Sequence, residues 1–420
     1  MKILVASHGH PQLSKGGAEI SAFQLFKDLG AALGHDTWFL GCDRDAQIGS
    51  SGCRISQPYS SREYIYSANE FDWFKFANLD ARFPSEFRDL LSKLRPDIVH
   101  FHHYVGFGVE AFLHVRETLP ECKIILTLHE YLALCNHFGQ MITNPHRLLC
   151  YEARPAACAD CFSKRSATDF FLRKAYIMRF FELVDHFIAP SEFLAERYAR
   201  WGISKDKISI IQNVIPDGEG RPSTRKPPTR GLLRVGFFGQ ISYLKGINVL
   251  FEAAAELLQR KVGEVTFEIY GDYAGQPSDF QEDFLARLST AGRNVKFKGP
   301  YDQTQVDRLM QSVSLVLVPS IWWENSPVVI EEALRNRRPV ICSDIGGMAE
   351  KIRDGVDGFH FPVGDSVALS TLISRLAKTP SRLSKLHASM RMPARARLAI
   401  DRHDELYGSV LHRNPRVVGL

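Results

Sequence analysis

The chain has 420 residues, of which 45% are hydrophobic and 24% are charged, and its net charge is +5. This length predicts two domains, and the composition is ordinary for a globular protein. The mild positive charge permits contact with an anionic membrane surface, but no motif for nucleic acid accompanies it. No apolar run reaches the roughly 18 residues of a membrane-spanning helix. Eight cysteines in so long a chain do not suggest a disulfide framework. We therefore expect a cytoplasmic protein, with peripheral contact at the inner membrane face as an option.

Strands and helices are predicted to alternate along the first half of the chain. The first apolar run ends at residues 8–11, so it predicts a strand rather than a signal peptide. Helices are predicted between the strands, for example at 17–33 and 192–201, whereas residues 51–87 are aromatic-rich and predict no defined element. The predicted strands are 2–7, 37–41, 97–102, 123–128, 186–189 and 208–211.

Residues 215–232 are polar and rich in proline and glycine, which predicts a linker between domains at 1–214 and 233–395. The alternation then restarts, with strands predicted at 233–238, 266–270, 295–298, 314–318 and 339–342. An α/β protein with two Rossmann-like domains and parallel sheets is therefore expected. Such folds bind ligands at the carboxyl ends of strands, in a cleft between the halves.

The segment at residues 322–333 carries the most informative pattern. It follows an apolar run and predicts a helix with Ser326 as N-cap and Pro327 at the first helical position. The N–H groups of a helix start bind anions, and carboxylates suit hydroxyl groups. Glu324 and Glu332 offer a carboxylate on either side of that start. The ligand implied is a phosphate with polyols at both ends, such as a nucleotide-sugar. Its phosphates would face the residues between the two carboxylates, which are Asn325, Ser326, Pro327 and Val328.

The seven residues between Glu324 and Glu332, with the Ser-Pro start and Ala333, resemble the Glu-x7-Glu motif of retaining GT-B glycosyltransferases of family 4. The resemblance covers nearly the whole chain and is strongest over residues 235–361. It implies a GT-B fold and transfer of a sugar, with retention, from a UDP- or GDP-linked donor to an acceptor hydroxyl. It further implies that Glu324 contacts the donor sugar, that Glu332 holds the ribose, and that a final helix near 396–420 packs on the first domain.

Four further positions match the family pattern. Gly16 and Gly17 open a helix after the first strand, as in the loop that faces donor phosphate and acceptor in the family. Lys245 matches a cation for the diphosphate, whereas Gln240 stands where the family usually has arginine. His129 ends a strand where the family places a histidine near the reacting centre. The alternatives without a functional role are a structural turn at Gly16 and Gly17, a solvated surface lysine at Lys245 and a polar strand cap at His129.

Two clusters suggest metal ligands. His100 and His102 share one strand face and could bind a metal, but packing or acceptor contacts are preferred because the family needs no catalytic metal. Four cysteines after His129 could hold a structural zinc beside the acceptor site, with free thiols as an equal alternative. These four are Cys135, Cys150, Cys158 and Cys161.

The expected reaction builds negative charge on the departing diphosphate, which Lys245, the helix start and the Gly16–Gly17 amides would stabilise. Domain closure about the linker would align the substrates and exclude water. The acceptor could be a lipid-linked saccharide, a growing polysaccharide or a small molecule. The basic aromatic helix expected at 164–184 could lie on a membrane, although core packing is preferred. A GT-B sugar-nucleotide epimerase and a non-catalytic sugar-nucleotide-binding protein are the alternatives.

Overall fold

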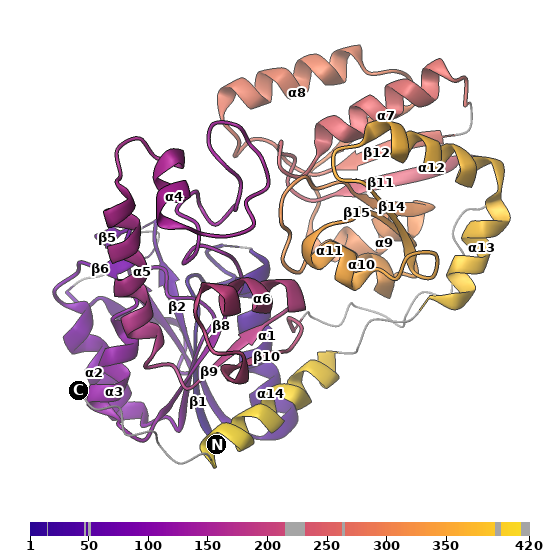
Figure 1. Cartoon of the computed structure of the whole chain (residues 1–420). Helices are drawn as coiled ribbons and strands as arrows, with labels where there is room; N and C mark the ends of the chain where they lie inside the picture. Colours follow the sequence, from indigo (N-terminus) through magenta and orange to yellow (C-terminus); the bar gives the residue numbers. More distant parts are fainter. Residues whose placement is uncertain are drawn as a thin grey trace. The chain divides into compact units, whose positions relative to one another are not determined.

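The computed structural model describes residues 1–14, 16–45, 48, 52–214, 232–262, 265–390 and 396–412 (Figure 1). The chain forms two compact units. Unit 1 comprises residues 1–216 with 394–420, and unit 2 comprises residues 217–393. The linker predicted at 215–232 lies, except for Leu232, outside the described residues.

Unit 1 is built on an eight-stranded sheet in the order β10-β9-β8-β7-β1-β2-β4-β3. All neighbouring strands run parallel except β3 and β4, which form an antiparallel pair. The central strands are buried except at Lys2, as expected for a parallel sheet covered on both faces. The strands are β1 (Lys2–Ala6), β2 (Asp36–Asp43), β3 (Ile55–Ser60), β4 (Glu63–Ser67), β7 (Ile98–Phe101), β8 (Lys123–Thr127), β9 (His186–Ala189) and β10 (Ile208–Ile210).

The helices of unit 1 begin and end at local signals in the sequence. The Ser166 hydroxyl accepts the Asp169 N–H and the Asp169 carboxylate accepts in return, which starts α5 three residues after the predicted position. Ser191 caps α6, and Gly34 ends α1 in the left-handed conformation. The helices are α1 (Gly17–Leu33), α2 (Phe83–Leu94), α3 (Ala111–Thr118), α4 (Pro155–Cys161), α5 (Ala167–Phe181), α6 (Glu192–Trp201), the short 3-10 helix η1 (Lys205–Lys207) and α14 (Ala396–Leu411).

The last helix, α14, belongs to unit 1 although it follows unit 2 in the sequence. It lies beside α1 (Figure 1). Its residues Ile400, Tyr407 and Val410 are buried in the same core as Ile3 and Ile98 of the sheet. A sheet face that would otherwise meet water is thereby covered by the end of the chain.

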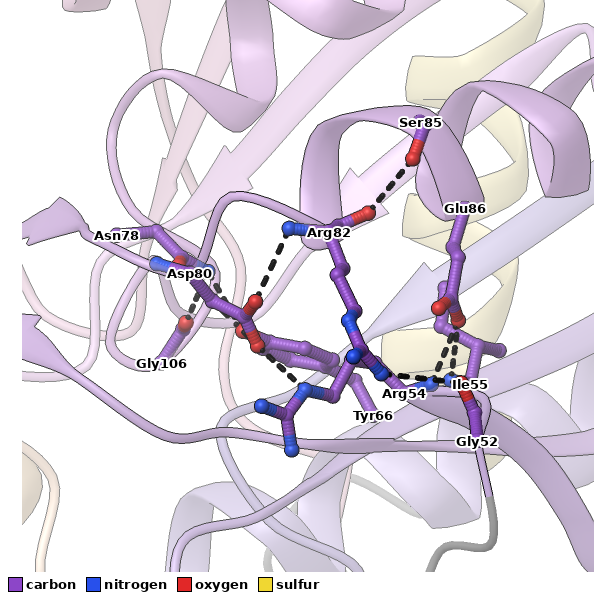
Figure 2. A network of polar contacts seen from close by, with 10 residues as sticks. All are labelled: Gly52, Arg54, Ile55, Tyr66, Asn78, Asp80, Arg82, Ser85, Glu86 and Gly106. Carbon is purple, nitrogen blue, oxygen red and sulfur yellow. Dashed lines mark hydrogen bonds and ion pairs between the residues drawn. The ribbon is translucent and has the colours of Figure 1, made fainter.

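No element was predicted for residues 51–87, of which 52–87 are described and are held by a polar network (Figure 2). The segment contains β3, β4, α2 and a small hairpin of β5 (Phe71–Asp72) and β6 (Ala77–Asn78). Arg54 Nε pairs with Asp80 Oδ2 at 2.8 Å, and Glu86 Oε2 accepts the backbone N–H groups of Arg54 and Ile55 at 2.7 and 2.8 Å. Order here depends on bonds between residues some 30 positions apart, which no local pattern reveals.

Unit 2 is an all-parallel sheet of six strands in the order β13-β12-β11-β14-β15-β16, the doubly wound order of Rossmann folds. Residues alternate between its faces. Along β11, for example, Val235 and Phe237 join one buried core while Phe238 joins the other. The strands are β11 (Leu233–Phe238), β12 (Val265–Tyr270), β13 (Val295–Gly299), β14 (Leu315–Val318), β15 (Val340–Ser343) and β16 (Gly358–Phe361).

The helices of unit 2 cover both faces of its sheet. They are α7 (Ile247–Gln259), α8 (Ser278–Thr290), η2 (Gln303–Gln305), α9 (Val306–Ser312), α10 (Val328–Arg335), α11 (Gly346–Lys351), α12 (Ser366–Lys378) and α13 (Pro380–Ser389). Two Rossmann-like halves with parallel sheets confirm the predicted fold class. The eleven predicted strands are present with ends shifted by at most two residues, whereas β16 was not predicted.

Candidate active site

The order of strands in unit 2 reverses between β11 and β14, and the carboxyl ends of these two strands carry most of the predicted donor site. Open α/β sheets bind ligands at this point because neighbouring loops there turn in opposite directions. Lys245 lies in the loop after β11, and Glu324 lies in the loop after β14. Gln240 is exposed and supplies no charge beside them.

Glu324 is held by three donors. Its side chain is buried, with 6% exposure, and its Oε1 accepts Lys245 Nζ at 2.5 Å, Ser320 Oγ at 2.8 Å and Trp322 Nε1 at 3.0 Å. The Lys245 ammonium, which has three N–H donors, also lies 5.7 Å from the centre of a Trp322 ring. Within the described residues all three bonds reach the same oxygen, Oε1, and none reaches Oε2.

Glycines let the loops around Glu324 approach one another closely. A Cβ on Gly246, whose φ is 73°, would collide with the carbonyl oxygen of Pro319. A Cβ on Gly347 would collide with the carbonyl oxygen of Asn325, and the Gly347 N–H donates to the Glu324 carbonyl at 2.9 Å. The backbone that carries Glu324 is therefore braced from two neighbouring loops.

Helix α10 begins one residue later than predicted. Its first residue is Val328, and Pro327 is the N-cap in an extended conformation with φ −60° and ψ 118°. Ser326, which was predicted to cap the helix, precedes the cap, and no side chain makes a capping bond. The N–H groups that open the helix are consequently those from Val328 onward, because proline has no N–H to offer.

Glu332 is the fifth residue of α10, little more than one turn inside the helix. It is buried, and burial raises the pKa of its carboxyl group, although the hydrogen bond from Gln303 opposes this. Gln303 Nε2 donates to Glu332 Oε1 at 2.7 Å. Sequence reasoning missed Gln303, which lies 29 positions away and has no motif of its own. Sequence reasoning also assigned no role to Ser320 and Trp322, which donate to Glu324 from four and two positions away.

In unit 1, four histidines gather at the carboxyl ends of β1, β7 and β8, where the order of its strands reverses. The rings of His8 and His103 lie 4.4 Å apart. His102 Nδ1 and His129 Nε2 share a hydrogen bond of 3.0 Å, and His103 Nε2 lies 3.3 Å from Glu130 Oε1. Burial, followed by the charges of His103 and His403, lowers the pKa of His129 to about 3. His129 is thus neutral at physiological pH.

The glycine pair at the start of α1 accommodates a carboxylate. Gly16 is the N-cap, and a Cβ on it would collide with the side chain of Glu19. Glu19 is buried and accepts Ser14 Oγ at 3.0 Å, while His8 Nε2 lies 3.3 Å from the same carboxylate oxygen. A carboxylate beside a helix N-terminus is favourable. Gly16 and Gly17 therefore lie beside the histidine cluster.

The predicted zinc site is not formed. Among the described residues, no group of three or more His, Cys, Asp or Glu side chains is placed to hold a metal, and this also excludes the pair His100 and His102. Cys150 Sγ instead donates to the Glu152 carbonyl at 3.4 Å. Burial raises the pKa of Cys135, and burial with the nearby Cys135, Cys150 and Cys161 raises the pKa of Cys158 to about 12. Cys161 is likewise a free cysteine.

Two family models match the chain, one in each half. The model described as Glycosyltransferase Family 4 matches residues 15–218, and the model described as Glycosyl transferases group 1 matches residues 224–397. The chain is therefore a family 4-like glycosyltransferase of group 1.

Among curated relatives, the D-inositol 3-phosphate glycosyltransferase of Streptomyces scabiei is 26% identical over 239 residues, which cover 53% of this chain and 51% of that protein. The D-inositol 3-phosphate glycosyltransferase 1 of Catenulispora acidiphila is 28% identical over 309 residues, or 70% of this chain and 66% of that protein. The chain thus spans about half to two thirds of the length of these relatives. These matches favour neither the epimerase nor the non-catalytic alternative.

Solved structures share the fold over nearly the whole chain. Anabaena HepE in complex with UDP and glucose matches with a TM-score of 0.66 and 17% identity, covering 97% of this chain and all of that one (100%). Sucrose-phosphate synthase from Thermosynechococcus elongatus matches with a TM-score of 0.70 and 18% identity, covering 97% and 98%. At such low identity the likeness establishes the GT-B fold. In the described ranges, every helix is too short or too polar to cross a bilayer.

Proposed function

We propose that this chain transfers a sugar from a nucleotide diphosphate-sugar to an acceptor hydroxyl, with retention at the anomeric carbon, in the synthesis of a polysaccharide, glycolipid or other glycoconjugate. The observation that carries the proposal is the buried Glu324, held by three donors on one oxygen while the second remains for a sugar hydroxyl. The buried Glu332 on the helix that follows is the partner expected for the ribose.

The chemistry breaks the bond between the anomeric carbon and the diphosphate and forms a bond to the acceptor oxygen, whose proton leaves with the diphosphate. Charge therefore grows on the diphosphate oxygens. Lys245 and the N–H groups that open α10 are the donors proposed to stabilise it. One ammonium hydrogen of Lys245 is used by Glu324, and two remain. His129, neutral and half-buried, is the residue of unit 1 proposed to serve the reacting centre.

A uridine diphosphate-sugar is the donor that the comparisons favour. HepE was solved with UDP and with UDP-glucose, and the Staphylococcus aureus protein TarM, also similar in fold, with UDP. The exposed Gln240 stands where the family pattern usually has an arginine. Because glutamine carries no charge, Lys245 is left with more of the phosphate charge to neutralise.

Binding of UDP is expected to stabilise the wild-type protein and not Glu332→Ala. A nucleotide at about 100 times its Kd adds roughly 2.7 kcal/mol to the free energy of unfolding, a readily visible rise in Tm. The measurement is thermal unfolding with a panel of nucleoside diphosphates and their sugars. Glu331→Ala is the matched control, since its carboxylate lies one residue away and pairs with Lys351 instead. If no nucleotide raises the Tm of the wild type, the transferase proposal fails.

We further propose that α5 contacts an anionic membrane, as a lipid-linked acceptor would require. The helix buries Phe170, Ile177 and Phe180 in the core as expected, yet Phe171 and Leu172 are 61% and 57% exposed. Exposed basic residues flank this apolar pair, namely Lys164, Arg165 and Arg179. Apolar side chains with basic neighbours are typical of interfacial helices.

The double substitution Phe171→Ser with Leu172→Ser is expected to weaken binding to phosphatidylglycerol vesicles about tenfold or more, since each side chain would bury part of its apolar area. Co-sedimentation measures it. Leu285→Ser, at an exposed leucine of α8 in unit 2, is the control and should leave binding unchanged. Equal binding by all three proteins would contradict membrane contact through α5.

A further inference from the structure

The contact between His102 and His129 links the proposed catalytic histidine to the interior of unit 1. His102 follows β7 and His129 follows β8, and the two rings stack with centroids 5.2 Å apart. The hydrogen bond joins Nδ1 of His102 to Nε2 of His129 at 3.0 Å. The position of the His129 ring is therefore coupled to that of the His102 ring.

His102 is itself immobile because its surroundings are packed. Its side chain is 2% exposed, and its ring lies 4.4 Å from that of His100. His100 is held on both sides, by Tyr407 Oη at 2.6 Å and by Thr127 Oγ1 at 2.7 Å. Tyr407 comes from α14, so the end of the chain holds the first member of this row of rings.

The direction of the hydrogen bond follows from the other nitrogen of His102. Within the described residues, His102 Nε2 is buried and has no hydrogen-bond partner. A buried acceptor without a partner is tolerated more often than a buried N–H without one. His102 therefore carries its proton on Nδ1 and donates it to His129 Nε2. With Nε2 accepting, a neutral His129 carries its own proton on Nδ1.

We propose that His102 is a positioning residue, which fixes the ring orientation and the Nδ1–H tautomer of His129. This inference rests on the proposed function, since it gives His129 its part in sugar transfer. The titratable groups that face His102 are His8, His100, His129 and His403, and burial with these neighbours lowers the pKa of His102 well below its usual value. The pair therefore stays neutral, with one shared hydrogen between the rings.

The geometry of the amide side chains supplies a sharp test. An asparagine amide takes the place of Nδ1 of a histidine, whereas a glutamine amide takes the place of Nε2. His102→Asn should therefore keep the bond to His129, and His102→Gln should lose it. His102→Phe keeps the shape of the ring without the bond. His186→Gln is the control, at a buried histidine of β9 whose Nε2 partner is Ser209 at 2.8 Å.

The first readout is release of UDP from UDP-glucose. We expect His102→Gln and His102→Phe to lower kcat about tenfold, the size of one lost hydrogen bond, with KM nearly unchanged. His102→Asn and His186→Gln should stay within about threefold of the wild type. If Asn, Gln and Phe at position 102 all give the same kcat, the positioning role is wrong.

The second readout is independent of activity. The 15N shifts of the His129 imidazole at pH 7 should show a proton on Nδ1 in the wild type and in His102→Asn, and a changed ratio of tautomers in His102→Gln. A wild-type His129 protonated on Nε2 overturns the inference. A wild-type enzyme that releases no UDP, yet shows the expected tautomer, contradicts the proposed function while the hydrogen bond stands.

Discussion

Glu324→Gln is expected to lower kcat/KM for sugar transfer by a factor of about 100 to 1,000, the effect typical of losing one preorganised electrostatic contact in an active site. The Glu324 carboxylate binds a lysine, a hydroxyl and an indole N–H on a single oxygen. An amide in its place loses the negative charge that orients Lys245, and in one of its two orientations it also turns its NH2 group toward these donors. Steady-state kinetics with the donor identified by thermal unfolding measure the loss.

The matched control is Glu331→Gln. Glu331 lies on α10, the helix that follows the loop of Glu324, and forms an ion pair with Lys351; both side chains are largely buried. Its substitution removes a carboxylate from a similar environment without touching the carboxyl ends of β11 and β14. We expect a lower Tm for this variant with nearly unchanged kcat/KM. If the two variants lose activity equally, the loss reflects stability, and Glu324 has no special part in transfer.

The free energy of unfolding is expected to fall steeply as the pH drops below about 6.5. Burial lowers the pKa of His129 to about 3 and that of His403 to about 4. Between pH 6.5 and 4 the unfolded chain binds protons at these two residues and the folded chain does not. Stability is therefore lost as the pH falls, by about 1.4 kcal/mol per pH unit for each histidine, or about 2.8 kcal/mol per pH unit for both.

Urea unfolding at pH 7.5, 6.0 and 5.0 measures this dependence. His403→Gln should reduce the slope by about one proton, because it removes one buried neutral imidazole from the folded state. His146→Gln is the control, since His146 is exposed on the surface of unit 1. A slope that is the same in wild type and His403→Gln would show that His403 does not contribute.

Much of the fold followed from local patterns. The bounds of α1, α6, β9 and β11 agree with the predicted ranges at both ends. These elements have a continuous apolar pattern and a clear cap or turn at each end, so neighbouring residues contain enough information. Helix α10 shows the limit of this reasoning, because the Ser-Pro pair suggested a cap one residue too early.

The candidate site was likewise predictable from the sequence only in part. The spacing of Glu324 and Glu332 lies within one short segment, and it was visible without a structure. The side chains that hold these carboxylates come from elsewhere, Lys245 from the loop after β11 and Gln303 from the segment after β13. The zinc prediction failed because cysteines close in sequence are not placed as metal ligands in space.

The sequence by itself determined the class of fold, the two halves and the pair of acidic residues around the start of one helix, because each depends on periodicity or on spacing over a few residues. Only the tertiary structure decided that Lys245 meets Glu324, which ring supports His129, and that α14 completes unit 1. These contacts join residues up to 307 positions apart, as between His100 and Tyr407. They form only when the sheets bring the ends of separate strands together, and no local pattern carries that information.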